Sequence, residues 1–465
     1  MKKLYSYKLL SHPDRLLYDH LNNTANLSKE IINSKILNFT NIDKERLSTI
    51  SFIIGLSHDI GKATIYFQQY ITEKDEKRKD LLKNKPETHH GLLSSLFTYY
   101  LVKKYIESND IKITNLIELL PIISYIVVRR HHGDLHDALD ELYIDEEQNK
   151  IIEQQLDKID YNEIQEIFNS NLSKNILSIN IKEFIKKIYI NYSKDISENK
   201  KLVRDLKNKK DLSLYFIFQL FYSVLLESDK TDVIFRENKI KKRELINSNI
   251  VDIYKKKEFS QNNNIMNKFR NEIYNEVTGK IEKISLGDKI YSLNVPTGTG
   301  KTLTSLSFAF KLREKIKKEL DYLPKIIYSL PFLSIIEQNI ETIEKLFKKS
   351  QNKSVDTSIL LKHHHLSDVY YKMNDNEYEI EKSEFLIEGW NSEIIITTFW
   401  QFFHTLFSNK NSMIRKFHNL ANSIIIFDEV QSIPYKYWKL INQSLKFLTE
   451  KLQTYIIFLT AIPNQ

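Results

Sequence analysis

The chain has 465 residues, 42% hydrophobic and 28% charged, which is ordinary for a globular protein and long enough for two or three domains. It contains no cysteine, which excludes disulfides, thiolate nucleophiles and cysteine-based zinc sites. Any metal must therefore be held by histidine and carboxylate side chains. The formal net charge of +8 suits a nucleic-acid partner, although lysine is used heavily throughout and weakens that signal.

The sequence offers no membrane-directed segment. The N-terminus, Met1-Lys2-Lys3, does not lead into the apolar core of a signal peptide. The longest apolar stretch, residues 116–128, is interrupted by Glu118 and Pro121 and is too short to span a bilayer. We therefore expect a cytoplasmic protein that has no membrane partner.

Residues 1–240 carry the pattern of a helical domain. Apolar residues recur three and four positions apart, without the alternation that is typical of strands. We therefore predict an all-α first domain. Its predicted helices cover residues 92–104, 114–129, 151–168, 181–192 and 212–228.

A His-Asp pair stands at the end of an apolar helical run in this half. The pair is His58-Asp59, and Ile-Gly-Lys follows it, ending at Lys62. A His-Asp pair is a weak signal on its own, and a second one, His136-Asp137, is interpreted as solvated surface. Lys62 would stand about one helical turn beyond the first pair, where its ammonium group could meet a phosphate. His58, Asp59 and Lys62 are the predicted catalytic residues of this half.

Further candidates for metal ligands are spread through the same half. Imidazoles with carboxylates suit Mn²⁺, Fe²⁺, Co²⁺ or Ni²⁺ better than Ca²⁺. Two such ions can hold the attacking and leaving oxygens of a phosphodiester. Each residue alone could be an ordinary surface or capping residue, and the neighbouring His12 and His89 stay open as alternatives. The predicted ligand set is His20, His58, Asp59, His90, His131, His132 and Asp229.

The pattern changes after a basic, asparagine-rich stretch between residues 239 and 264. We place the end of the first domain at residue 240 and interpret residues 241–284 as a linker and lead-in. Short apolar strands then alternate with helices, which predicts a parallel α/β sheet with ligands at the carboxyl ends of its strands. The predicted strands cover residues 289–295, 325–330, 392–398, 423–429 and 454–460.

A phosphate-binding loop is predicted directly after the first of these strands. Residues 295–302 read Val-Pro-Thr-Gly-Thr-Gly-Lys-Thr and precede a helical pattern. Lys301 would reach the β- and γ-phosphates, and the Thr302 hydroxyl would ligate Mg²⁺. Val295 stands where the general pattern has its first glycine, and an ordinary Gly-Thr turn is the alternative interpretation. The predicted nucleotide-binding residues are Thr297, Gly298, Thr299, Gly300, Lys301 and Thr302.

A second nucleotide element is predicted at the end of the fourth strand. There an apolar run ends in two acids, Asp428 and Glu429. In the same sheet as the loop, Asp428 would hold Mg²⁺, and Glu429 would orient and deprotonate the water that attacks the γ-phosphate. A strand that happens to end in Asp-Glu is the alternative, and the upstream loop favours the nucleotide interpretation.

Together, these segments resemble the signature nuclease-helicase of type I CRISPR systems, in which a metal-dependent HD-type nuclease precedes a superfamily-2 helicase. His20, the His58-Asp59 pair with Lys62, His90, the paired histidines and Asp229 match the family's metal-site residues in order. Residues 331–339 and 396–402 are similar to its DNA-contact motifs, and residues 428–434 to its ATPase acid motif. The resemblance covers nearly the whole chain.

The resemblance implies an HD-type nuclease domain over residues 1–240 and a RecA-like first helicase lobe over residues 285–465. It implies two transition-metal ions, ATP and Mg²⁺ as cofactors. Its implied partners are single-stranded DNA and a guide-RNA surveillance complex that recruits the protein to the displaced strand of invader DNA. Motif matching places Ser334, Gln338, Thr397 and Thr398 near the nucleic acid.

The chain stops soon after its fifth predicted strand, so we expect a truncation before a second helicase lobe and an incomplete ATPase.

Two other function classes stay open. A metal-dependent nucleotide phosphohydrolase with a regulatory ATPase lobe is the first alternative. A DNA-binding remodeller without a working metal site is the second.

Overall fold

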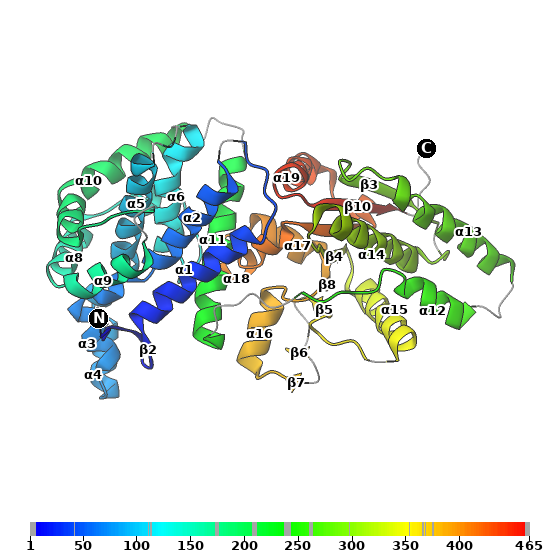
Figure 1. Ribbon diagram of the computed structural model, residues 1–465, viewed down its shortest axis with the longest axis horizontal. Coiled ribbons are helices and arrows are strands. Elements are labelled where there is room, and N and C mark those ends of the chain that lie inside the picture. The colour runs from blue at the N-terminus through cyan, green and yellow to red at the C-terminus, as the bar shows by residue number, and fades with distance from the viewer. Residues whose placement is uncertain are drawn as a thin grey trace, which may run out of the picture. The chain divides into compact units, whose positions relative to one another are not determined.

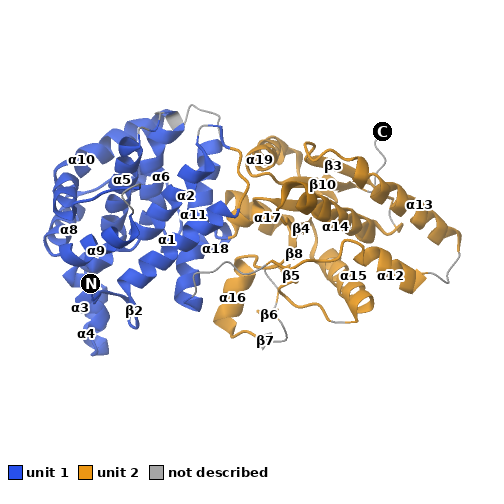
Figure 2. Cartoon of the chain, in the orientation of Figure 1, with its two compact units in different colours: residues 1–34, 39–240, 409–415 blue, residues 35–38, 241–408, 416–465 orange. Residues whose placement is uncertain are grey.

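A computed structural model describes most of the chain, and its residues fall into two compact units (Figures 1 and 2). Unit 1 comprises residues 1–34, 39–240 and 409–415, and unit 2 comprises residues 35–38, 241–408 and 416–465. The described residues are 6–40, 42–109, 111, 114–172, 176–206, 212–236, 243–259, 264–296, 298–352, 354–364, 367, 369–373 and 376–460. The boundary predicted at residue 240 lies outside them.

Unit 1 is helical apart from one small antiparallel hairpin of β1 and β2. The short 3₁₀ helix η1 (Ile60–Ala63) follows α2. The elements are β1 (Leu10–His12), β2 (Arg15–Leu16), α1 (Leu17–Asn33), α2 (Lys44–Ser57), α3 (Ile65–Thr72), α4 (Glu76–Lys83), α5 (Gly91–Ser108), α6 (Asn115–Arg129), α7 (Ala138–Glu141), α8 (Glu146–Asp157), α9 (Tyr161–Asn171), α10 (Ile181–Leu206), α11 (Ser213–Phe235) and α18 (Asn411–Ile414).

Helices α1, α2, α5, α6 and α11 form the core of unit 1. Helix α2 is buried from Leu47 to Ser57, so its apolar residues face neighbours on all sides. Asp43 caps its N-terminus by accepting a hydrogen bond from the Arg46 amide at 2.8 Å. A Cβ at Gly55 would lie 2.8 Å from the Cα of Ala25, so glycine lets α1 and α2 approach closely.

One predicted helix of this half is two helices. Residues 151–168 were expected to be continuous, but α8 ends at Asp157 and α9 begins at Tyr161. The Asp160 carboxylate accepts hydrogen bonds from the amides of Asn162 and Glu163, which starts a new helix at this point. A capping aspartate inside an apolar pattern is the physical reason for the break.

Residues 409–415 come from the second half of the sequence but belong to unit 1. They lie beside the turn that follows α6. The Asn411 side-chain amide donates to the carbonyl of His131 at 2.9 Å, and the Leu135 amide donates to the carbonyl of Asn409 at 2.8 Å. Lys410 pairs with Asp134 at 2.6 Å. Both ends of this segment continue into unit 2.

Unit 2 contains a parallel sheet with the strand order β3-β10-β9-β4-β8-β5. A small antiparallel pair, β6 and β7, stands apart from it. The strands are β3 (Ile290–Asn294), β4 (Lys325–Leu330), β5 (Leu360–His363), β6 (Lys372–Met373), β7 (Asn376–Glu377), β8 (Ile394–Thr398), β9 (Ser423–Asp428) and β10 (Tyr455–Thr460). The helices are α12 (Ile250–Phe259), α13 (Ile265–Gly279), α14 (Lys301–Leu320), α15 (Leu333–Gln351), α16 (Ile380–Glu388), α17 (Phe399–Phe407) and α19 (Trp438–Lys451).

Side chains of alternate strand residues fill the two sides of this sheet. Ile326, Tyr328 and Ile424 belong to a core shared with helices α12 to α15. On the other side, the Phe427 ring packs edge to face against Phe402 of α17, with ring centroids 5.0 Å apart. Strands β4 and β9 are buried along their whole length, as their continuous apolar runs predicted.

The five strands predicted from the sequence are present, and the helical domain followed by a parallel-sheet lobe is confirmed. The sheet also contains β5 (Leu360–His363), which the sequence analysis missed. Within residues 241–284, interpreted as a linker and lead-in, the structure has two helices that belong to unit 2. Across the described residues, no helix combines the length and apolar character that crossing a membrane requires.

Candidate metal and nucleotide sites

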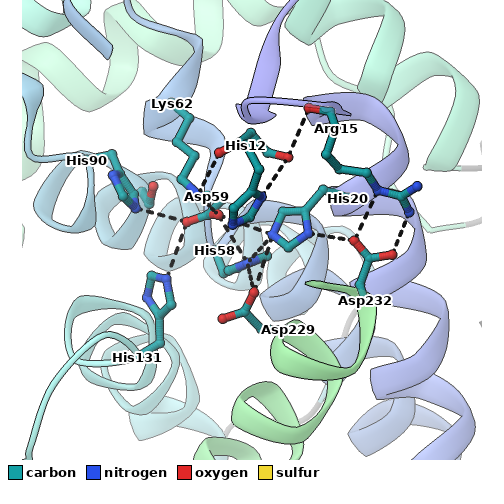
Figure 3. A network of polar contacts seen from close by, with 12 residues as sticks. His12, Arg15, His20, His58, Asp59, Lys62, His90, His131, Asp229 and Asp232 are labelled. Atoms are coloured by element: carbon teal, nitrogen blue, oxygen red, sulfur yellow. Dashed lines mark hydrogen bonds and ion pairs between the residues drawn. The ribbon is translucent and has the colours of Figure 1, made fainter. Parts of the chain in front are cut away.

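The predicted metal-site residues meet in unit 1 around the carboxylate of Asp59 (Figure 3). Asp59 follows α2 directly and is 1% exposed. The surrounding side chains come from separate elements, far apart in the sequence, whose packing brings them together. His20 lies on α1, His58 ends α2, His90 precedes α5, His131 and His132 follow α6, and Asp229 lies on α11.

One group of potential ligands faces the Oδ2 atom of Asp59. The Nε2 atoms of His20 and His58 lie 3.2 Å and 3.5 Å from it. Asp229 joins from α11, with its Oδ1 atom 3.4 Å from Nε2 of His20 and 3.6 Å from Nε2 of His58. All four side chains are almost entirely buried.

A second group faces the Oδ1 atom of the same carboxylate. The Nε2 atoms of His90, His131 and His132 lie 3.0, 3.3 and 3.8 Å from it. The Nε2 atoms of His90 and His132 are 2.9 Å apart. The His132 side chain is 55% exposed, so this group forms the open side of the cluster.

Lys62 also reaches Asp59. It lies on η1, and its Nζ is 2.6 Å from Oδ2 of Asp59 and donates to the carbonyl of Ser11 at 3.2 Å. Burial alone would raise the pKa of the Asp59 carboxyl, but Lys62, with His58 and His90, outweighs burial and holds that pKa well below its ordinary range. Asp59 is therefore a carboxylate at neutral pH.

The imidazoles differ in their ionisation. Burial lowers the pKa of His90 to about 4, and the neighbouring charge of His131, together with burial, lowers the pKa of His132 to about 2. Burial would also lower the pKa of His20, but hydrogen bonds to Asp232 and Asp59 outweigh it and raise that pKa to about 9. Neutral imidazoles such as His90 and His132 offer lone pairs to a metal.

The donor set fits a pair of transition-metal ions. Both carboxylate oxygens of Asp59 and the Nε2 of His131 are buried, and their contacts within the described residues are with Lys62 and with one another's charged or titratable groups. Such buried polar atoms need a partner. Three overlapping groups could each hold an ion: Asp59, His90, His131 and His132; His20, His58 and Asp59; and His58, His131 and Asp229.

The structure also places the residues that the sequence left open or missed. His89 is exposed, whereas the ring of His12 packs edge to face against His20 at 5.2 Å between centroids. Asp232, which the sequence analysis missed, accepts a hydrogen bond from His20 Nδ1 at 2.8 Å. A second acid one helical turn after Asp229 was the only sequence signal for it.

The predicted nucleotide-binding residues gather at the carboxyl edge of the sheet in unit 2. Lys301 begins α14, and its Nζ lies 2.8 Å from Oδ1 of Asp428 and also pairs with Glu429. Burial would lower the pKa of Lys301, but these two carboxylates outweigh it and raise that pKa. The loop and the acidic strand end, predicted separately, thus meet in one site.

Two further side chains in this site were not predicted. The Thr302 hydroxyl donates to Oδ1 of Asn339 at 2.8 Å, and the hydroxyl of Tyr328 donates to Oδ2 of Asp428 at 2.9 Å. Tyr328 is fully buried in β4, so this bond fixes the direction of the Asp428 carboxylate. Tyr328 is not part of a motif identified in the sequence, and Asn339 ends the segment 331–339, which was assigned to DNA contact and not to the nucleotide site.

The loop before α14 has the backbone expected of a phosphate cradle. Gly298 and Gly300 have φ angles of 75° and 87°, which residues with a side chain rarely adopt. The Thr299 hydroxyl donates to the carbonyl of Pro296 at 2.6 Å, which tightens the turn. Thr297, also predicted to contact nucleotide, lies outside the described residues.

The predicted nucleic-acid residues divide into two kinds. Ser334 and Gln338 are exposed near the start of α15, which follows β4. Thr397 is fully buried, and its hydroxyl donates to the carbonyl of His363 at 2.8 Å. Thr398 caps α17 by accepting from the Gln401 amide at 3.0 Å. The structure therefore gives the two threonine hydroxyls internal partners, whereas the first two side chains face solvent.

Comparison with known proteins agrees with the division of the chain into a helical unit and a unit with a parallel sheet. Residues 11–178 match the family described as "Cas3, HD domain", and residues 263–465 match "Type III restriction enzyme, res subunit". A CRISPR-associated nuclease/helicase Cas3 from Haloferax volcanii is 34% identical over 181 residues, which is 37% of this chain and 19% of that protein.

Solved structures share the fold over nearly the whole chain. The crystal structures of T. fusca Cas3 with ATP and of T. fusca Cas3 match 98% of the chain with a TM-score of 0.55, at 15% and 16% identity. The chain spans half the length of each of these solved chains. The chain thus has a helical HD domain of the Cas3 type followed by a parallel-sheet domain of the helicase type.

Proposed function

We propose that this protein is a CRISPR interference effector that cleaves single-stranded DNA in unit 1 and uses ATP in unit 2 to move that DNA. One observation carries the nuclease proposal: the seven side chains predicted as ligands meet in one cluster, in which five imidazoles face the two oxygens of Asp59. Such a cluster of imidazoles and carboxylates, open on one side at His132, suits metal-assisted hydrolysis of a phosphodiester.

In this proposal Asp59 is the shared ligand, because its two oxygens face two separate groups of imidazoles. Bound divalent ions would neutralise the charge that develops on the phosphate oxygens. Lys62 stabilises the ionised form of Asp59, and in this proposal its ammonium group would also meet a phosphate of the DNA. His90 and His132, on the open side, remain neutral and available as ligands.

For the second unit we propose an ATP–Mg²⁺ site. The ammonium of Lys301, which pairs with Asp428 and Glu429, would turn to the β- and γ-phosphates. Thr302 and Asp428 would hold Mg²⁺, and Glu429 would orient the attacking water. The backbone amides at the start of α14 lie at the positive end of the helix dipole, which favours the negative charge of the phosphates.

We further propose single-stranded DNA and a guide-RNA surveillance complex as partners. The similarity of this chain to Cas3 proteins supports both. Exposed Ser334 and Gln338, at the carboxyl edge of the sheet, can bind phosphates without reading bases. Thr397 and Thr398 would contribute to DNA binding mainly through the backbone that their hydroxyls hold in place.

The experiment that tests the nuclease proposal compares metal-dependent cleavage by three full-length proteins. The parent chain, stripped of metal and then supplied with Mn²⁺, should cut labelled single-stranded DNA. Asp59→Ala should lose this cleavage because both groups of imidazoles lose their shared carboxylate. His89→Ala is the matched control, since His89 is exposed and adjacent to His90.

Two results would contradict the proposal. Undiminished cleavage by Asp59→Ala would show that the metal cluster is not the nuclease site. Release of phosphate from free nucleotides in unit 1, without DNA cleavage, would instead support a nucleotide phosphohydrolase. Salt-sensitive DNA binding with no metal uptake would support a DNA-binding remodeller.

A further inference from the structure

Asp232 is a buried carboxylate that the proposed metal chemistry does not itself use. It is 1% exposed and lies one helical turn after Asp229 on α11. Its Oδ2 atom lies 2.8 Å from Nδ1 of His20. Helix α11 thus presents a potential metal ligand and a partner of another ligand on the same face.

The Asp232 carboxylate is held from two further directions (Figure 3). Arg15 of β2 contacts it twice, with Nη2 2.5 Å from Oδ1 and Nε 3.3 Å from Oδ2. The side-chain amide of Asn23, one turn beyond His20 on α1, donates to Oδ1 at 2.7 Å. The shorter of these contacts go to Oδ1, and Oδ2 faces His20.

This contact determines which nitrogen of His20 faces the cluster. With Nδ1 bonded to Asp232, the Nε2 atom points to Asp59 and Asp229. Within the described part of the chain, the Nδ1 atoms of His58 and His131 contact backbone carbonyls, of Gly55 at 2.8 Å and Val128 at 2.6 Å. Among these three buried imidazoles, His20 is the one whose Nδ1 is oriented by an ionised side chain.

We propose that Asp232 is a positioning residue that fixes the tautomer and ring plane of His20 for metal binding. The inference rests on the proposed metal site and adds that its two ion positions differ in their dependence on Asp232. Asp232 should increase the affinity for the ion held by His20, His58 and Asp59. The affinity for the ion held by Asp59, His90, His131 and His132 should not depend on Asp232. Hydrogen-bonded partners of metal-binding histidines typically change metal affinity about 10- to 100-fold.

The test is a calorimetric titration of Mn²⁺ into the full-length, metal-free chain. Asp232→Asn keeps the size of the side chain and removes its charge. It is expected to weaken one class of Mn²⁺ binding by about 10- to 100-fold and to leave the other class unchanged. Arg15→Gln is the matched control, because it removes another partner of the same carboxylate and leaves the contact with His20 in place.

The same substitution in a second variant chain distinguishes a positioning role of Asp232 from a general effect on folding. In a chain that already carries His20→Ala, Asp232→Asn is expected to change Mn²⁺ binding no further. Equal losses in Asp232→Asn and Arg15→Gln, the same loss in the His20→Ala background, or parent-like binding by Asp232→Asn would overturn the inference. A parent chain that binds no Mn²⁺ would instead overturn the proposed metal site, and the inference with it.

Discussion

The Nε2 atom of His90 lies 3.0 Å from Oδ1 of Asp59, on the opposite carboxylate oxygen from the one that faces His20. Asp59 therefore stands between two groups of imidazoles, one at each of its carboxylate oxygens. Its position directly after a buried helix gives the carboxylate little freedom to turn. This relationship makes Asp59 the residue on which both potential ion positions depend.

Gly61 controls how closely His90 approaches Asp59. A Cβ at Gly61 would lie 2.7 Å from the carbonyl oxygen and 3.1 Å from the Cβ of His90. We expect Gly61→Ala to push His90 away from Asp59, to weaken Mn²⁺ binding and to cost about 1–3 kcal/mol in the free energy of unfolding. Calorimetric Mn²⁺ titration and denaturant unfolding measure the two effects.

Gly133→Ala is the control for this variant. A Cβ there would meet nothing within 4 Å, although Gly133 directly follows His132. Its Mn²⁺ affinity should equal that of the parent chain. If Gly61→Ala also binds Mn²⁺ like the parent, the spacing between His90 and Asp59 does not govern the site.

Lys301→Ala should weaken the binding of Mg²⁺–ATP. The ammonium group that sits between Asp428 and Glu429 would be missing, leaving the two carboxylates to repel the phosphates. Loss of a charge-assisted contact of this kind costs about 1.5–3 kcal/mol, which corresponds to about tenfold or more in affinity. Lys317→Ala, on the same helix and paired with Asp321, should bind as the parent does. Equal affinities for both variants in a fluorescent-nucleotide titration would refute the assignment.

Glu393 joins two arginines inside unit 2. Its carboxylate accepts from Arg243 at 2.7 Å and from the amide of Glu244 at 3.0 Å, and it also pairs with Arg313. Glu393→Gln leaves a buried guanidinium without its counter-charge. We expect a loss of up to about 3 kcal/mol in the free energy of unfolding, limited by the partial exposure of Arg243. Denaturant unfolding at neutral pH measures it.

The same residue gives a pH dependence with a defined sign. Burial alone would raise the pKa of Glu393, but Arg243 and Arg313 outweigh burial and lower it below the ordinary value of 4.5. Its contribution is therefore fully present above that value and is lost as the pH falls through the lowered pKa. The stability difference between parent and Glu393→Gln should shrink as the pH falls below about 4.5. A difference that grows as the pH falls would contradict this explanation.

Much of the fold could be predicted because its strands are continuous apolar runs. Strand β4 has the predicted bounds, and β9 differs from its prediction by one residue. Strand β5, Leu360–His363, was missed because it is short, lies at the sheet edge and ends in polar residues. The break between α8 and α9 was missed because one capping aspartate, Asp160, interrupts an otherwise helical pattern.

Site residues that stand in a recognisable sequence motif could be predicted, whereas residues that contribute only through the packing of distant elements could not. His58 and Lys301 stand in recognisable segments, and the structure brings each to the predicted neighbours. Asp232, Tyr328 and Asn339 support those residues from other elements. The sequence signals for them are an acid one helical turn after Asp229 and the place of Asn339 at the end of residues 331–339, and neither signal shows which side chain is contacted. Their roles depend on which helices and strands pack together, which pattern alone does not provide.

The most direct test of the central claim is anomalous diffraction from crystals of the chain soaked in Mn²⁺. Our account predicts two anomalous peaks about 3.5–4 Å apart, one beside each carboxylate oxygen of Asp59. One peak should be bound by His20 and the other by His90. Crystals that take up Mn²⁺ elsewhere and show no peak within bonding distance of Asp59 would contradict it.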